Sequence, residues 1–119
     1  MGTNGKLQQA SMDFAIKLIR FYEQIECKAF LKNQLARAGT SIGANIHEST
    51  YAESPEDFIH KLGIALKECN ETEYWLNIVA EICPDLKKET LQLKNYAGSI
   101  RRMLIASIVT VKQRLGMEK

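Results

Sequence analysis

The sequence predicts a single all-helical domain, because three of its properties together favour helices over strands. The chain has 119 residues, of which 45% are hydrophobic and 25% charged, a composition typical of a soluble globular domain. It contains only seven glycines and two prolines, too few for the frequent turns of a β-sandwich. Apolar residues recur every three or four positions along four segments, which is the period of an amphipathic helix.

The first two segments predict helices over about residues 12–28 and 30–51. Each has one apolar face, made of Phe14, Leu18, Phe21 and Ile25 in the first and of Leu31, Leu35, Ala38, Ile42 and Ile46 in the second. Ser11 is the expected N-cap of the first helix. Residues 1–10 are expected to form a flexible N-terminal segment, and the small, polar start does not resemble a signal peptide. No strong helix breaker separates the two segments near Ala29.

The last two segments predict helices over about residues 55–82 and 86–115. Ser54 and Pro55 supply an N-cap hydroxyl and a proline at the first helical position. Pro84 interrupts the chain between the two helices, and Gly116 is the expected stop of the last one. Four helices with short connections favour an up-down-up-down bundle that occupies residues 11–116.

Two of the predicted helices carry more apolar surface than one core needs. Ile64, Trp75 and Ile82 lie off the core face of the third helix, and Ile105 and Val109 lie off that of the fourth. Stripes of exposed hydrophobic side chains usually mark an interface. We therefore expect self-association through these residues; the alternative is a monomeric bundle with some exposed hydrophobic side chains.

Charge is divided unevenly along the chain. Residues 1–46, 47–83 and 84–119 carry formal charges of +3, −6 and +5. The acidic third helix and the basic fourth helix could complement each other within or between subunits. The fourth helix could instead present a basic surface to nucleic acid. The candidate contacts are Lys87, Lys88, Lys94, Arg101, Arg102, Lys112 and Arg114.

The residues that usually carry catalysis or bind metals are scarce and unfavourably spaced. Cys27, Cys69 and Cys83 show no CxxC spacing, so reduced, core-type thiols are expected. The two histidines, His47 and His60, have no sequence context typical of a catalytic triad or a metal site. We therefore predict no enzymatic activity, no cofactor and no metal.

No apolar run approaches the length that spans a bilayer, and a cytoplasmic location is expected.

The run from Thr40 to Glu48 stands out in the second helix. Gly39 and Gly43 lie one turn apart, and such small residues let a neighbouring helix approach closely. Polar side chains at the margin of the bundle could form a network that specifies packing or assembly. They could instead bind a small ligand. The members of this predicted network are Ser41, Asn45, Glu48 and Glu71.

These residues also carry a resemblance to a known family. The run Ser41-Ile-Gly-Ala-Asn-Ile46, followed by Glu48, Asp57-Phe-Ile59, Ile64-Ala-Leu66 and Glu71-x-Glu-Tyr-Trp-Leu76, resembles the four-helix bundle proteins of the 23S rRNA intervening-sequence type, also called S23 ribosomal protein-like. The resemblance covers about residues 10–115. It implies a bacterial protein with a left-handed four-helix bundle assembled as a homopentamer, and no established biochemical activity. A more distant similarity links the family to the accessory protein of diversity-generating retroelements, which binds nucleic acid and a reverse transcriptase.

Taken together, these observations predict a non-enzymatic, oligomeric binding or scaffold module. Its expected partners are other copies of itself and RNA, DNA or a nucleic-acid-processing protein, engaged through the basic fourth helix, with no membrane. The alternative is a protein–protein adaptor that binds no nucleic acid and uses its charges in subunit pairing.

Overall fold

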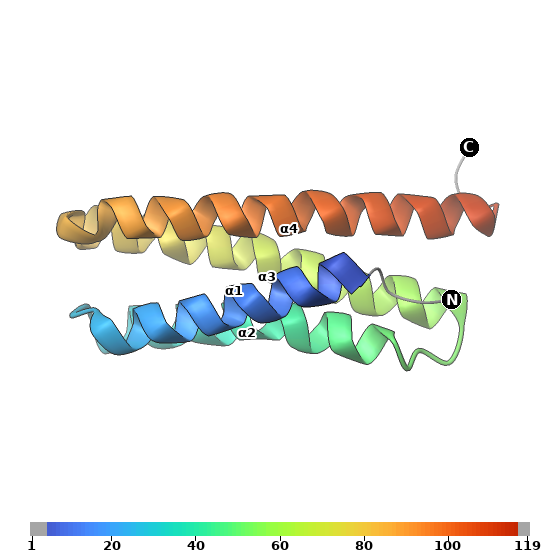
Figure 1. Ribbon diagram of the computed structural model, residues 1–119, viewed down its shortest axis with the longest axis horizontal. Coiled ribbons are helices and arrows are strands. Elements are labelled where there is room, and N and C mark those ends of the chain that lie inside the picture. The colour runs from blue at the N-terminus through green and yellow to red at the C-terminus, as the bar shows by residue number, and fades with distance from the viewer. Residues whose placement is uncertain (1–4, 117–119) are drawn as a thin grey trace.

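The computed structural model describes residues 5–116, which form four long helices. These are α1 (Gly5–Gln24), α2 (Ala29–Ser49), α3 (Pro55–Ile82) and α4 (Lys87–Arg114), with a short 3-10 turn, η1 (Pro84–Leu86), before α4. Successive helices run in opposite directions (Figure 1), and each packs against two others: α1 and α3 both contact α2 and α4. No strand occurs among the described residues. The predicted strand-free, four-helix architecture is therefore confirmed, while its left-handed packing and five-subunit ring stay predictions.

The first helix begins seven residues earlier than predicted. Leu7 is fully buried and lies two turns before Phe14, so it extends the apolar face of α1 toward the N-terminus. Ser11 is not the N-cap; it is buried within the helix, where its hydroxyl donates to the Gln8 carbonyl at 3.0 Å. The prediction of a flexible segment is thus wrong for residues 5–10, and residues 1–4 lie outside the described part of the chain. At its other end α1 stops at Gln24, four residues earlier than predicted.

Local signals define the ends of α3 and α4 as the sequence predicts. The Ser54 hydroxyl accepts a hydrogen bond from the Asp57 backbone N–H at 3.0 Å, and Pro55 occupies the first turn. The Ser54 hydroxyl satisfies one of the unpaired N–H groups at the start of the helix, and proline has no N–H that needs a partner. At the chain end, Gly116 takes a positive φ of 69° just beyond α4, a conformation that favours glycine.

The apolar faces predicted for the four helices meet in one continuous core. Phe14, Leu18, Ile42, Ile46, Phe58, Leu62, Ile100 and Leu104 are among its least exposed side chains. Each large apolar side chain buried in this way contributes about 1.5–3 kcal/mol. The core therefore supplies most of the free energy that holds the four helices together.

A close approach between α1 and α2 explains the glycine at position 39. A β-carbon there would overlap Leu18 Cδ2 and lie 3.5 Å from Phe14 Cε2. At Gly43 the nearest atom to such a β-carbon is Ser11 Oγ, at 3.4 Å. The expectation that these glycines let another helix pack closely is confirmed, and α1 is that helix.

A hydrogen bond between the Tyr96 hydroxyl and the Asp13 carboxylate joins α4 to α1. The Tyr96 hydroxyl donates to Asp13 Oδ2 at 2.7 Å, and its ring packs edge-on against Phe14 with centroids 5.6 Å apart. This hydrogen bond lowers the pKa of Asp13. Partial burial, and then the same bond, raise the pKa of Tyr96 to about 12. The pair therefore stabilises the α1–α4 contact when Tyr96 is protonated and Asp13 is ionised.

Candidate functional site

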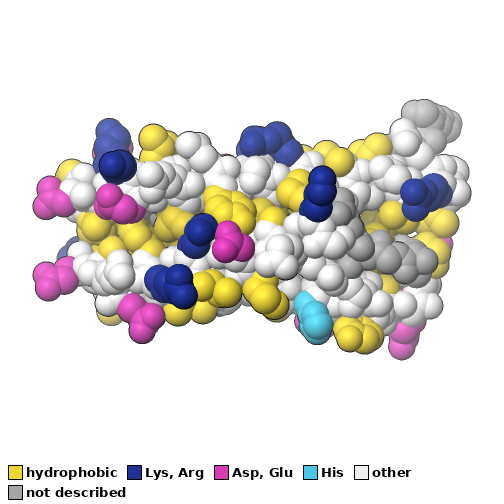
Figure 2. All heavy atoms as spheres, in the orientation of Figure 1, with side chains coloured by type: hydrophobic (Ala, Val, Ile, Leu, Met, Phe, Trp, Pro, Cys, Tyr) yellow, Lys and Arg dark blue, Asp and Glu magenta, His cyan; other side chains and the backbone are white. Residues whose placement is uncertain are grey.

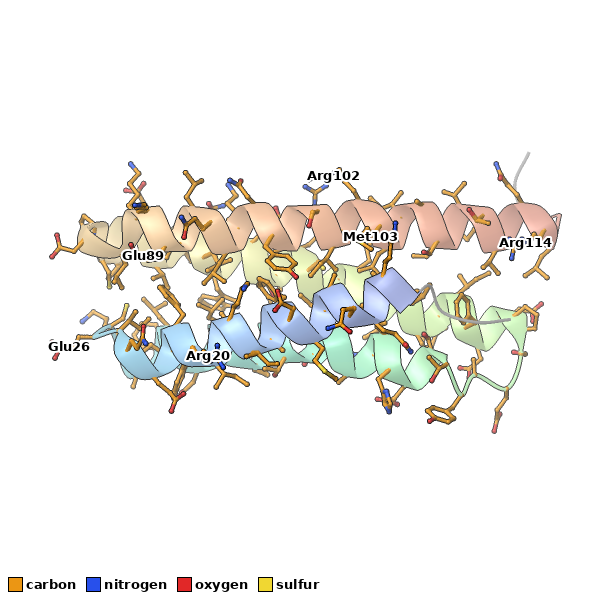
Figure 3. The ribbon with its side chains drawn as sticks, viewed as in Figure 1. Arg20, Glu26, Glu89, Arg102, Met103 and Arg114 are labelled. Atoms are coloured by element: carbon orange, nitrogen blue, oxygen red, sulfur yellow. The ribbon has the colours of Figure 1, made fainter. Side chains whose placement is uncertain are left out.

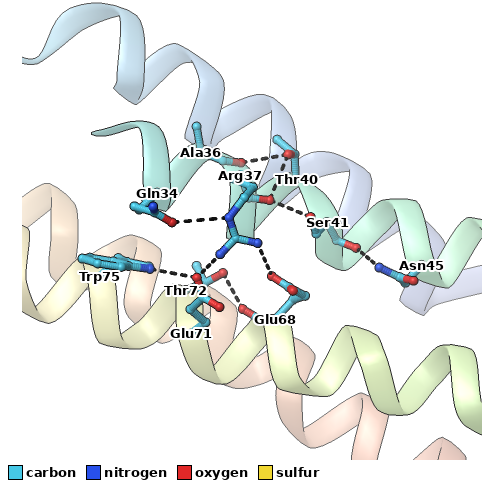
Figure 4. Close-up of polar contacts among 10 residues, drawn as sticks. All are labelled: Gln34, Ala36, Arg37, Thr40, Ser41, Asn45, Glu68, Glu71, Thr72 and Trp75. Atoms are coloured by element: carbon cyan, nitrogen blue, oxygen red, sulfur yellow. Dashed lines mark hydrogen bonds and ion pairs between the residues drawn. The ribbon is translucent and has the colours of Figure 1, made fainter. Parts of the chain in front are cut away.

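A cluster of polar side chains connects α2 to α3 on the surface of the bundle (Figure 4). Its centre is the Arg37 guanidinium, which donates to Glu71 Oε2, to Glu68 Oε2 at 3.4 Å and to Gln34 Oε1 at 3.4 Å. The Trp75 indole N–H donates to the same Glu71 oxygen at 3.0 Å. Two carboxylates thus share one guanidinium, which leaves this cluster with one net negative charge.

Three of the four residues of the predicted network are connected through Arg37. The Ser41 hydroxyl donates to the Arg37 carbonyl at 2.7 Å, and the Asn45 amide donates to the Ser41 carbonyl at 2.8 Å. Glu71 joins them only through the Arg37 side chain. No pattern within α2 could have indicated Arg37, because its acidic partners lie more than thirty residues away.

Glu48 does not belong to this network, and its inclusion was wrong. Its carboxylate lies 3.5 Å from Lys61 Nζ, in a separate and largely exposed ion pair between α2 and α3. The Asn45 amide donates within its own helix, and Glu71 Oε2 accepts from Arg37 and Trp75. No hydrogen bond or ion pair among the described residues joins Asn45, Glu48 and Glu71 to one another, and a ligand site between them stays a prediction.

The extra apolar residues of α3 belong to a second seam beside its core face. This α3 seam follows the spacing 4-3-4-3-4, which places its members on one face of a helix. It consists of Ile64, Glu68, Glu71, Trp75, Ile78 and Ile82. Ile82 is 51% exposed, and the other five are half-buried. The α3 seam lies on the flank of α3 that faces α2, because it contains the two carboxylates bound to Arg37.

A matching seam runs along α4 and combines basic with apolar side chains. This α4 seam consists of Lys87, Leu91, Lys94, Arg101, Ile105 and Lys112. Leu91 is 54% exposed and Ile105 is 43% exposed, and Val109, half-buried, lies next to the seam. Along the α4 edge of the molecule, Lys and Arg side chains alternate with hydrophobic ones (Figure 2). Most of the predicted nucleic-acid contacts therefore share one face with the predicted subunit contacts.

The seven basic residues of α4 differ in their exposure and in whether they already form an ion pair within the chain. Arg101 Nε donates to Glu73 Oε1 of α3 at 2.8 Å, so this cation is already paired within the chain. Lys88 and Arg102 are exposed and form no ion pair within residues 5–116, and Arg102 points away from the bundle (Figure 3). Arg114 follows Lys112 by two residues and so projects from nearly the opposite side of α4. The structure thus does not gather all seven cations into one surface.

Residues 5–116 contain neither a group of candidate metal ligands nor a candidate membrane span. No three His, Cys, Asp or Glu side chains are grouped there as metal ligands would be. None of the described helices is both long and apolar enough to cross a membrane.

Comparison with known proteins agrees with this architecture. Residues 3–106 match the family model described as 23S rRNA-intervening sequence protein. A solved structure of a protein with unknown function, from the S23 ribosomal protein family of Bacteroides thetaiotaomicron VPI-5482, is 37% identical with a TM-score of 0.81. The match covers 86% of this chain and 97% of that one. No curated protein matches the chain. Since the family model covers most of the chain, from before α1 to well within α4, this four-helix protein belongs to the 23S rRNA-intervening sequence protein family.

Proposed function

We propose that this protein is a self-assembling scaffold in which the α3 seam of one copy packs against the α4 seam of the next. The observation that carries the proposal is the complementary composition of the two seams. The α3 seam combines four apolar side chains with Glu68 and Glu71, whose cluster with Arg37 keeps one net negative charge, and the α4 seam combines two apolar side chains with four basic ones. Apolar stripes of this kind are typical of interfaces, and opposite charges select the correct partner and register.

The positions of the seams favour a closed ring over a symmetric dimer. The α3 seam lies on the α2 side of α3, next to Arg37, whereas the α4 seam contains Arg101, which reaches the opposite flank of α3 at Glu73. Pairing of two different surfaces is heterologous, and such contacts generate a ring when the rotation between copies closes. The family resemblance implies five copies in that ring.

Light scattering of the purified protein after gel filtration tests the assembly. We expect an oligomer for the unchanged chain and a 13.5 kDa species for Trp75→Glu and for Ile105→Glu, because each buries a charge in the proposed contact. Tyr51→Glu is the control, since Tyr51 is 75% exposed and lies outside both seams. Helical circular dichroism must stay unchanged. A monomeric unchanged chain, or seam variants that keep the oligomer mass, would contradict the proposal.

A second candidate function is nucleic-acid binding by the assembled scaffold. It is favoured by the exposure of Lys88 and Arg102, which form no ion pair within the described residues and lie beside the α4 seam. These side chains would stay accessible when the α4 seam is covered by another copy. They would bind phosphate groups and would supply affinity with little sequence preference.

Binding to labelled structured RNA and duplex DNA over a salt series tests this second function. We expect the logarithm of the affinity to fall linearly with the logarithm of salt concentration. The double variant Lys88→Glu with Arg102→Glu should reduce binding about tenfold or more. The control, Arg20→Glu with Lys28→Glu, makes the same change in net charge on α1 and the connection after it. Equal losses in both variants, or no binding at low salt, would leave a scaffold whose partners are proteins.

A further inference from the structure

Two cysteines from different helical hairpins meet at one end of the bundle. Cys27 lies in the connection between α1 and α2, and Cys83 lies between α3 and η1. The Cys83 thiol donates to Cys27 Sγ, with the two sulfurs 2.7 Å apart, and also lies 3.9 Å from the Glu26 carbonyl. Both residues are half-buried, while Cys69 is fully buried in the core. The expectation of core-type thiols is therefore confirmed for Cys69, whereas Cys27 packs against the edge of the core and Cys83 is half-buried outside it.

The position of the pair allows the sulfurs to bond with little rearrangement. A disulfide bond is about 2.05 Å long, so the sulfurs need to approach by less than about 1 Å. Neither residue belongs to a helix. Short connections adjust their backbone more easily than helix interiors, because fewer hydrogen bonds restrain them.

The pair also lies where the fold lacks a covalent connection. The α1–α2 hairpin and the α3–α4 hairpin are joined through residues 50–54, at one end of the bundle (Figure 1). At the opposite end, where the α1–α2 and α3–α4 connections lie, the chain itself does not join the two hairpins (Figure 1). A bond between Cys27 and Cys83 would tie the hairpins together at that second end.

We propose that Cys27 and Cys83 form a reversible intramolecular disulfide when the protein meets a small-molecule disulfide such as oxidised glutathione. The Cys27 thiolate attacks one sulfur of the oxidant, which gives a mixed disulfide and releases one glutathione thiolate. Cys83 then loses its proton and attacks the Cys27 sulfur, which releases the second glutathione thiolate. The protein loses two protons and two electrons, and the oxidant becomes two thiols.

The environments of the three cysteines decide the order of attack and exclude the third. The hydrogen bond that Cys83 donates to Cys27, followed by partial burial, raises the pKa of Cys83 to about 11. Because Cys83 holds its proton in the hydrogen bond to Cys27, the acceptor sulfur, that of Cys27, is the one that attacks first. Burial raises the pKa of Cys69 to about 12. This thiol stays protonated and covered, and it serves as an internal reference.

Incubation of the full chain with defined ratios of oxidised to reduced glutathione, followed by alkylation of the remaining thiols, tests the proposal. We expect the free thiols to fall from three to one. Digestion after glutamate separates Cys69 from Cys83, because Glu71, Glu73 and Glu81 lie between them. Mass spectrometry should then find Cys27 linked to Cys83 and Cys69 alkylated.

The melting temperature supplies a second readout. Closing the loop of residues 27–83 should raise it by about 10 °C, and reductant should reverse the rise. Cys27→Ser and Cys83→Ser should melt at the same temperature in oxidised and reduced buffer, whereas Cys69→Ser should keep the difference. Three free thiols after oxidation, a glutathione adduct without the linked peptide, or a bond between two chains would overturn the proposal.

Discussion

Replacement of Gly39 by alanine tests whether the close contact between α1 and α2 requires a residue without a β-carbon. In a helix interior, alanine is favoured over glycine by about 1 kcal/mol. At Gly39 the added methyl group would overlap Leu18 Cδ2 and touch the Phe14 ring. Leu18 and Phe14 are both fully buried in the core, so a shift of Leu18 away from the added methyl group would press on neighbouring core side chains. Overpacking of this kind costs about 1–3 kcal/mol.

Gly63 supplies a matched control on α3. A β-carbon at Gly63 would have no other atom within 4 Å, so Gly63→Ala gains the helix preference without a packing cost. We expect Gly63→Ala to stabilise the protein by about 1 kcal/mol and Gly39→Ala to destabilise it by about 1 kcal/mol. Because both variants gain the same helix preference, the difference between their free energies of unfolding equals the packing cost at Gly39.

Urea unfolding followed by circular dichroism measures both free energies of unfolding. The midpoints should move in opposite directions with unchanged slopes, since neither change alters the area exposed on unfolding. In thermal melts a difference of 2 kcal/mol corresponds to about 8 °C for a chain of this size. A Gly39→Ala variant as stable as Gly63→Ala would refute the argument that the α1–α2 spacing depends on this glycine.

Two further changes test individual polar contacts. Tyr96→Phe should cost about 1 kcal/mol at neutral pH, because it removes the hydrogen bond to Asp13. Because the pKa of Tyr96 is raised to about 12, this stabilisation is complete below about pH 10 and is lost as the pH rises through about 12. The difference in urea midpoint between Tyr96→Phe and the unchanged chain should therefore narrow above pH 10. A constant difference would contradict the hydrogen bond between Tyr96 and Asp13. Arg37→Gln should cost up to about 1 kcal/mol, because the guanidinium is half exposed and two carboxylates lose their shared partner. Arg102→Gln removes the same charge from an exposed side chain and should leave the melting temperature unchanged; equal effects would show that the Arg37 cluster contributes no stability.

The helices and their core faces could be predicted from the sequence because the signals are local. Apolar spacing along each segment identified core residues such as Phe14, Ile42 and Leu104, all fully buried. The hydroxyl of Ser54 and the glycine at position 116 indicated ends that the structure confirms. The start of α1 was missed because a single apolar residue, Leu7, carries the apolar face through a polar stretch.

The candidate surfaces were predictable only in part. Single-helix spacing indicated Trp75 and Ile105 as residues outside the core. It did not indicate that Arg101 is paired with Glu73 or that Arg37 holds Glu68 and Glu71. Those pairings depend on how two antiparallel helices are aligned, and many alignments are compatible with the same spacing.

The sequence by itself determined the helical class, the apolar face of each helix, the stop at Gly116 and the family. Each of these properties depends on residues within one or two helical turns of each other, or on a contiguous sequence motif such as Ser41 to Ile46. Only the tertiary structure decided which side chains meet across the bundle. Cys27 and Cys83 are 56 positions apart, and nothing near either one indicates the other. They meet because the packing of four helices around one core sets the register of the hairpins, and that packing is a property of the whole chain.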